Sequence, residues 1–144
     1  MSQTLTVAQV KELIPNRFPI LYIDKVTSLE FGQEIIAQKQ ITYNEDFCQS
    51  QPENPHMPGT LVLETLAQAG SILILKTPEF LGKTAYIGGI NDAHFYEFVR
   101  PGDTLELRFS ITKMKGNVGT ADAVATVGEK KVADCVFTFI VGAK

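Results

Sequence analysis

The sequence predicts an α+β fold in which an antiparallel sheet wraps around one long central helix. The first observation is a stretch at 58–76, rich in leucine and alanine and without proline after its first residue, which is typical of a buried helix. The second is that two strand-like segments precede this helix. The third is that four more follow it, mostly joined by tight turns. These 144 residues are enough for one hydrophobic core and too few for two typical domains, so we expect a single domain over residues 1–144.

The central helix has recognisable ends. Pro58 occupies a position that the first turn of a helix tolerates, Lys76 suits the negative pole at its end, and Pro78 stops it. Its length approaches the roughly 20 residues that cross a bilayer. However, Glu64 and Gln68 lie inside the stretch, and no second apolar span exists. We therefore interpret it as a core helix and expect no membrane partner.

A thin polar face runs along this otherwise apolar helix. Thr60, Glu64, Gln68 and Ser71 are spaced four, four and three residues apart, which places them on one side. A carboxylate on a buried helix is costly unless it is paired, protonated or next to a cavity. Two interpretations stay open: a stripe that reaches solvent at one edge, or a carboxyl group shielded from bulk water that lines a pocket beside the helix N-terminus.

The segment before the central helix predicts a short helix and a hairpin. Thr6 can cap a helix over residues 7–14, which Pro15 ends. Residues 20–26 and 34–42 then form two strands with a turn at Gly32.

The remaining chain predicts one long loop and four strands. Residues 44–57 are rich in Asn, Gln and Pro, and a long loop of this kind is often functional. Gly88 and Gly89 indicate a bulge in the first later strand. The last strand is apolar on both faces, so we place it in the sheet interior. The four strands cover residues 83–95, 105–111, 121–127 and 132–141.

Composition excludes several classes of partner. The net charge of −3 and the absence of a basic cluster argue against nucleic acid and anionic membranes. Cys48 and Cys135 make neither a disulfide framework nor a zinc motif, and we find no cofactor fingerprint. The first residues lack a secretory signal, so we expect a cytoplasmic protein without metal or cofactor.

Three stretches carry a resemblance to a known family: residues 14–26, residues 55–69 with Pro-His-Met-Pro-Gly at their start, and residues 89–103. The sequence resembles the hotdog-fold dehydratases of the FabZ and FabA type, which act on 3-hydroxyacyl chains carried by acyl carrier protein. The resemblance implies lyase activity in fatty-acid or polyketide-type metabolism, with acyl carrier protein as a partner. It also implies a homodimer whose sheets join edge to edge, assembling as a trimer of dimers in some members, with each site drawing on both subunits.

In that family, a loop histidine works opposite a carboxylate on the central helix. By position the carboxylate is Glu64, whereas Ser50 occupies the place of the histidine. A histidine does occur six residues later, as His56. In the third stretch, His94 stands where the family has arginine, and we expect it to face outward from a strand.

Dehydration needs a base for the proton next to the carbonyl, an acid for the departing hydroxyl, and a group that stabilises the enolate-like oxygen. Histidine, whose ordinary pKa is about 6.5, suits the first role. Glu64 suits the second, and the amide of Gly59 at the helix start suits the third. Ser50 is too weak a base, so His56 is the candidate, although it can equally pack or cap near the helix start. The substrate-binding candidates are Ser50, Gln68 and Phe95.

Three functions remain open from the sequence. The first is a dehydratase acting on 3-hydroxyacyl thioesters, and the Pro-His-Met-Pro-Gly motif with Glu64 and Gln68 favours it. The second is a hotdog thioesterase, for which Glu64 alone suffices. The third is a catalytically degenerate acyl-binding subunit that pairs with an active partner, and Ser50 favours both alternatives. Neither the acyl chain length nor the carrier, acyl carrier protein or coenzyme A, follows from the residues.

Overall fold

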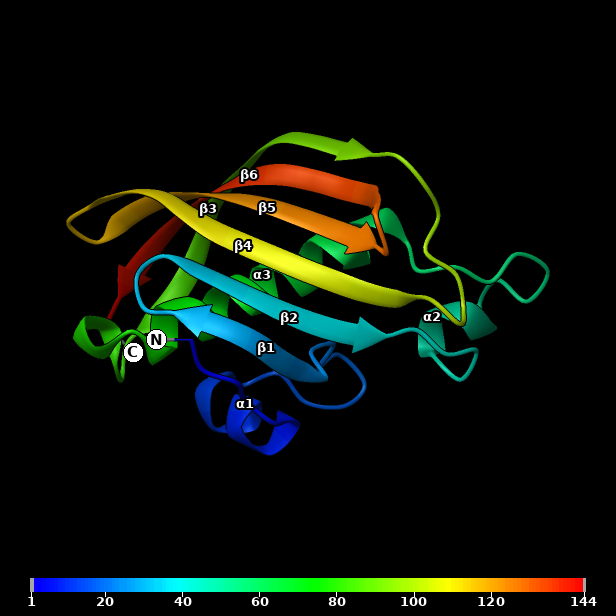
Figure 1. The fold of residues 1–144 in the computed structure, drawn as a ribbon, viewed down its shortest axis with the longest axis horizontal. Helices are drawn as coiled ribbons and strands as arrows, with labels where there is room; N and C mark the ends of the chain where they lie inside the picture. Colours follow the sequence, from blue (N-terminus) through cyan, green and yellow to red (C-terminus); the bar gives the residue numbers. More distant parts are fainter. Residues whose placement is uncertain (1, 144) are drawn as a thin grey trace.

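The computed structural model describes residues 2–143 and shows a six-stranded antiparallel sheet curved around helix α3 (Gly59–Lys76) (Figure 1). The sheet order is β1-β2-β4-β5-β6-β3. The predicted fold class is therefore confirmed, as is the order of two strands, one long helix and four strands. The strands are β1 (Lys25–Glu30), β2 (Glu34–Gln40), β3 (Thr84–Phe95), β4 (Thr104–Lys115), β5 (Val118–Val127) and β6 (Lys130–Gly142). The other helices are α1 (Val7–Leu13), α2 (Asp46–Gln49) and the short 3₁₀ turn η1 (Pro78–Phe80).

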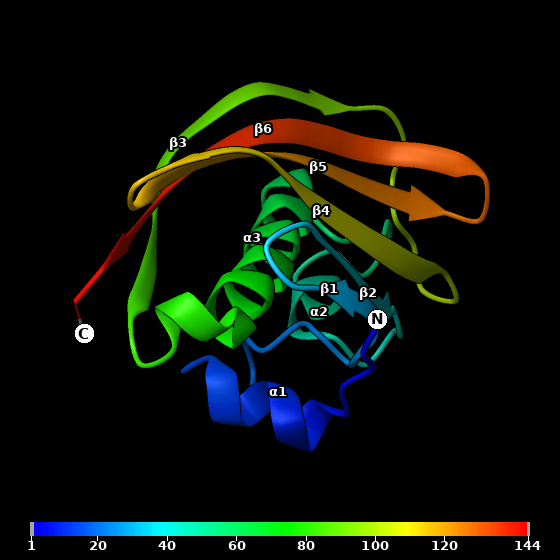
Figure 2. The same ribbon diagram turned by 60° about the vertical axis from the view of Figure 1, so that its left-hand side comes forward.

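Helix α3 packs against the concave face of the sheet, and α1 lies on the side of α3 that faces away from the sheet (Figure 2). Alternate residues of the strands point inward, so Phe109, Phe137 and Phe139 are almost fully buried. Gly70 has no side chain, which lets the Phe109 ring approach the helix backbone directly. Helix α3 is long and apolar enough to cross a membrane by length and composition alone, but 56% of it is buried inside the protein. This burial is typical of a core helix, as predicted.

The first strand begins later than the predicted residue 20, at Lys25. The reason lies on α3, because the Gln68 side chain binds the backbone of the preceding segment. It accepts a hydrogen bond from the Tyr22 amide (2.9 Å) and donates one to the Ile20 carbonyl (2.8 Å). Ladder pairing starts only with the Asp24 amide, which donates to the Gln38 carbonyl. A helix side chain thus replaces a neighbouring strand over residues 20–22.

The N-terminal helix and the long loop differ in how well they were predicted. Thr6 caps α1 in a reciprocal arrangement with Gln9, as the sequence indicates. The loop at 44–57 contains the unpredicted helix α2, whose four residues are too few for a periodic signal. Phe47 and Cys48 anchor this turn in the core.

The two edges of the sheet are different. The N-terminal segment covers β1, since Leu5 and Val26 exchange backbone hydrogen bonds of 3.0 and 2.9 Å. The outer side of β3 has no such cover among residues 2–143. Its register shifts between Ile87 and Gly89, which confirms the predicted bulge. β6 pairs with β5 and β3, so its interior position is also confirmed. The exposed apolar side chains of β3 are Tyr86, Ile87, Ile90 and Phe95.

Candidate active site

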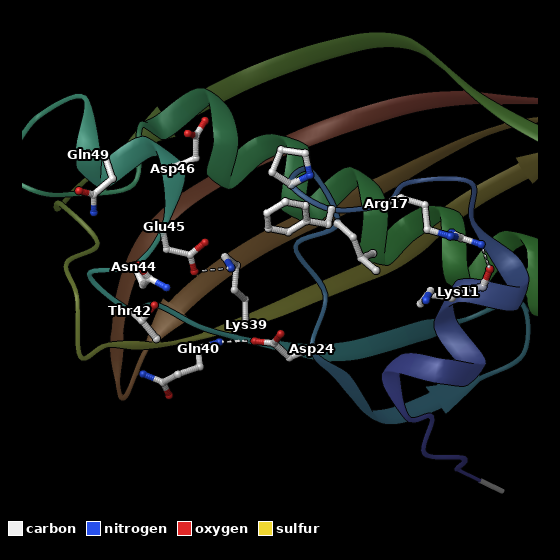
Figure 3. Close-up of a pocket in the computed structure, with 13 residues that line it drawn as sticks. Lys11, Arg17, Asp24, Lys39, Gln40, Thr42, Asn44, Glu45, Asp46 and Gln49 are labelled. Carbon is white, nitrogen blue, oxygen red and sulfur yellow. Dashed lines mark hydrogen bonds and ion pairs between the residues drawn. The ribbon is translucent and has the colours of Figure 1, made fainter.

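The larger of two hollows beside α1 has a volume of about 1050 Å³ and is lined mainly by polar side chains (Figure 3). These groups bind one another. Lys39 contacts Glu45 at 2.8 Å, and the Asp24 carboxylate accepts a hydrogen bond from the backbone N–H of Gln40 at 2.8 Å. Arg17 turns away toward the carbonyl end of α1 and donates to the Lys11 and Ile14 carbonyls. Four of its six charged side chains are therefore bonded within the protein, whereas those of Lys11 and Asp46 have no hydrogen-bond or ion-pair partner among the described residues.

The second hollow, which we call the helix cleft, lies along the polar face of α3 and has a volume of about 430 Å³. The end of α1, the segment after it and the start of β3 form its other walls. Its size is within the range of small-ligand sites. Its walls combine apolar side chains with charged ones, among them the carboxylates of Glu12 and Glu64. An acyl substrate and acid catalysis require both kinds of group. Its lining includes Leu13, Ile14, Pro15, Glu64, Ala67, Gln68, Ser71, Leu75, Ala85 and Ile87.

Glu64 and Gln68 lie on adjacent turns of one helix face, and their side chains are hydrogen-bonded. The Gln68 amide nitrogen donates to Glu64 Oε2 at 3.1 Å. Gln68 itself is 3% exposed and is held by the backbone of Ile20 and Tyr22. Three contacts thus fix the Gln68 side chain, and the fixed amide in turn orients the carboxylate. Gln68 lines the helix cleft, both ends of its amide already have partners, and its role as a substrate-binding residue stays a prediction.

The carboxylate of Glu64 is exposed within one protomer, which corrects the expectation that it is shielded from bulk water. The physical reason is that α3 turns this side away from the sheet, toward the cleft between α1 and β3. Of the two open interpretations, the structure supports elements of both. The stripe reaches solvent, and the carboxylate also lines a cleft.

Gly59 and Phe95 meet in a smaller apolar hollow at the start of α3. A side chain at Gly59 would lie 2.6 Å from the Phe95 ring, so only glycine permits this contact. Pro58 provides no side-chain cap, and the amides of Gly59 and Thr60 have no acceptor among the described residues. These free N–H groups, at the positive end of the helix dipole, can stabilise a developing negative charge.

His56 packs against Phe98, which lines this hollow, but His56 itself does not line it. The two ring centroids are 4.5 Å apart, and His56 Nδ1 is 2.7 Å from the Asn54 carbonyl oxygen. Within residues 2–143, no hydrogen bond or ion pair joins His56 to Glu64. Glu64 lines the helix cleft, whereas His56 lines neither this cleft nor the hollow of Gly59.

Ser50 and His94 have roles that the structure shows directly. Ser50 caps α2, and its hydroxyl donates to the Phe47 carbonyl at 3.0 Å. It lines neither the helix cleft nor the hollow of Gly59. His94 is exposed on β3, as predicted, and contacts Asp134 at 3.3 Å.

Sequence reasoning missed the residues that orient the predicted ones. Asn54, Phe98 and Arg100 surround His56, yet the sequence marks them only as parts of a loop and a turn. The one sequence feature that could have indicated them is the closeness of Asn54 to His56, which it precedes by two residues.

Neither metal ligands nor reactive thiols occur at the site. Among residues 2–143, no three His, Cys, Asp or Glu side chains gather in a way that would hold a metal ion. Both cysteines are buried and unpaired. Burial, and then the charge of Asp134, raises the pKa of Cys135 to about 11, so its thiol stays protonated.

Comparison with known proteins identifies relatives of this chain and of its fold. The model of the FabA-like domain matches residues 14–135. A 3-hydroxyacyl-[acyl-carrier-protein] dehydratase FabZ from Pediococcus pentosaceus is 54% identical over 96% of this chain and 94% of its own. The enzyme of the same name from Enterococcus faecalis is 52% identical over 99% of both chains. Among solved structures, the dehydratase heterocomplex ApeI:P from Xenorhabdus doucetiae has a TM-score of 0.79 at 13% identity, covering 94% of this chain and 91% of its own, which confirms the fold.

Proposed function

The chain belongs to the FabA-like domain family, and from that premise we propose that it is a lyase that dehydrates 3-hydroxyacyl thioesters in fatty-acid metabolism. The observation that carries this proposal is the Glu64 carboxylate, oriented by Gln68 beside a cleft with both apolar and polar walls. The names of the similar dehydratases support acyl carrier protein as the carrier of the substrate. A cytoplasmic location fits this role.

The elimination assigns one task to each group. His56 takes the proton from C2 of the acyl chain. The electron pair of the broken C2–H bond then forms the C2–C3 double bond as the C3–O bond breaks. Glu64, in its protonated form, gives its proton to the departing hydroxyl, which leaves as water. The Gly59 amide stabilises the enolate-like oxygen of the thioester, and Phe95 packs beside it. Exchange with water returns both side chains to their starting states.

The complete site requires a second copy of the chain. Because His56 and Glu64 share neither a hydrogen bond nor a hollow within one chain, we infer that two protomers join along β3 and bring them together. The uncovered edge of β3 and its exposed apolar residues support this pairing, whereas β1 is already covered. A further assembly of three such dimers remains an expectation from the family.

The dimer can be tested by light scattering of a variant with Ile87→Lys and Ile90→Lys. Charges on an edge strand oppose pairing, so we expect a monomer without dehydratase activity. Val118→Lys provides the control, since Val118 is also an exposed apolar residue (43%) but lies on β5. A variant that stays dimeric and active would contradict pairing along β3.

A non-catalytic acyl-binding subunit is the second candidate, and Ser50 favours it. The Ser50 hydroxyl already donates to the Phe47 carbonyl, and it has no hydrogen bond to a basic side chain among the described residues. It therefore neither accepts a substrate proton nor acts as an activated nucleophile. If His56 is not the base, this chain needs a partner that supplies one.

One set of assays separates these functions. The protein is incubated with a 3-hydroxyacyl, an enoyl and a saturated acyl thioester, each on acyl carrier protein and on coenzyme A, while loss of water and release of thiol are followed. We expect dehydration that His56→Ala reduces by roughly 10²–10⁴-fold, the range of general acid–base catalysis. Thiol release without dehydration would instead indicate a thioesterase. Inactivity in all assays, with activity gained in Ser50→His, would indicate the degenerate subunit.

A further inference from the structure

The hydrogen bond of His56 selects one form of its imidazole ring. A backbone carbonyl oxygen only accepts hydrogen bonds, so the 2.7 Å contact with the Asn54 carbonyl requires a proton on Nδ1. In the neutral ring, Nε2 then carries the free electron pair. Among the described residues, Nε2 has no hydrogen-bond partner. The ring is therefore held in the tautomer that can take a proton from a substrate.

Arg100 joins the side chain of Asn54, the residue whose carbonyl makes this bond, to the ring on which His56 packs. Its Nη1 donates to Asn54 Oδ1 at 2.7 Å, and its guanidinium carbon lies 5.2 Å from the centre of the Phe98 ring. The Arg100 amide is itself held by the Asp103 carboxylate at 2.9 Å. A cation above an aromatic face is attracted to it, so Arg100 orders the Phe98 ring as well.

A backbone hydrogen bond also joins the two segments just before α3 begins. The Met57 amide donates to the Val99 carbonyl at 2.8 Å, and Met57 is 2% exposed. The 54–57 and 98–100 segments are thus joined at two points, one in the core and one at the surface through Arg100 and Asn54.

From these contacts we infer that Asn54, Phe98 and Arg100 are positioning residues, which hold His56 with Nδ1 protonated and Nε2 free as the base. The inference depends on the proposed function, in which His56 takes the substrate proton. It extends that function to a device that compensates for serine at position 50, using residues up to 46 positions apart in the chain.

Nuclear magnetic resonance of ¹⁵N-labelled protein tests the device without any substrate. The chain contains only two histidines, so His56→Gln assigns both sets of ring signals. We expect the neutral His56 ring to carry its proton on Nδ1 in the wild type, and a mixture of tautomers in Arg100→Ala. Arg108→Ala is the matched control, since Arg108 makes a contact of the same length, 2.7 Å, with Glu34 on β2. An unchanged His56 tautomer in Arg100→Ala would overturn the inference.

Kinetics on the same variants separates positioning from general support of the fold. Arg100→Ala should lower kcat for dehydration by roughly 10- to 100-fold with little change in KM, the scale of a misplaced catalytic group. Arg100→Lys, which keeps a donor for Asn54, should recover part of this loss, and Arg108→Ala should match the wild type. Equal kcat in Arg100→Ala and wild type would overturn the inference. Full dehydration by His56→Gln would instead show that His56 is not the base of the proposed function. The tautomer measurement would still show whether Arg100 fixes the His56 ring.

Discussion

The carboxylates of Glu64 and Asp134 occupy opposite kinds of surroundings. Glu64 accepts one hydrogen bond, from the neutral amide of Gln68, and lines the helix cleft. Asp134, on β6, binds Lys131 at 3.1 Å, the Tyr96 hydroxyl at 3.0 Å and His94 at 3.3 Å. One carboxylate keeps free oxygen lone pairs beside a cleft, whereas the other is saturated by donors.

The pKa of Asp134 shows what this difference means for chemistry. Burial raises it, but the hydrogen bonds from Lys131, Tyr96 and His94 outweigh burial and lower it below its ordinary value. Asp134 therefore stays ionised near neutral pH and cannot donate a proton. The comparison teaches that the donors around Asp134 already occupy both of its oxygens, whereas among the described residues only Gln68 bonds to Glu64.

The largest expected effect belongs to Glu64→Gln. This variant keeps the shape and a polar end but removes the proton that the departing hydroxyl needs, so dehydration should fall by roughly 10²–10⁴-fold. The free energy of unfolding should change by less than about 0.5 kcal/mol, because Glu64 is exposed. Steady-state kinetics and urea unfolding measure the two quantities. Retained activity would show that Glu64 resembles Asp134 in being structural.

Gln68→Leu should have the next largest effect, and mainly on stability. It leaves the Tyr22 amide and the Ile20 carbonyl without their buried partner, which should cost roughly 2–4 kcal/mol of unfolding free energy. Ser71→Ala, on the same helix face and half-buried, is the control and should cost far less. Thermal and urea unfolding report the difference. An equally small effect in both variants would show that Gln68 does not hold the segment before β1.

Asp134→Asn should have the smallest effect. Its partners Lys131 and His94 are half exposed or more, so the loss at neutral pH should not exceed about 1 kcal/mol, and dehydration should be unchanged. Because the folded pKa of Asp134 lies below its unfolded value, the ionised form stabilises the fold above about pH 4. This stabilisation is lost as pH falls through the folded pKa. Unfolding free energies measured from pH 7 to pH 2.5 should therefore depend less on pH in the variant.

The sequence by itself determined the elements whose residues repeat with a regular period. The apolar run of α3 and the alternation along β4 and β5 indicate burial directly. Every second side chain of a strand, and every third or fourth side chain of a helix, lies in the same surroundings. The same regularity placed Glu64 and Gln68 on one face. The family resemblance, also drawn from the sequence, is confirmed by the match to residues 14–135.

Only the tertiary structure decided how these parts become a candidate site. Residues 20–22 read as a strand, yet their backbone binds Gln68, 46 residues away from Tyr22. Likewise, Asn54 meets Arg100 across 46 residues and thereby orients His56. Such contacts leave no periodic mark in the chain, because they depend on where separate segments are brought by the packing of the whole core.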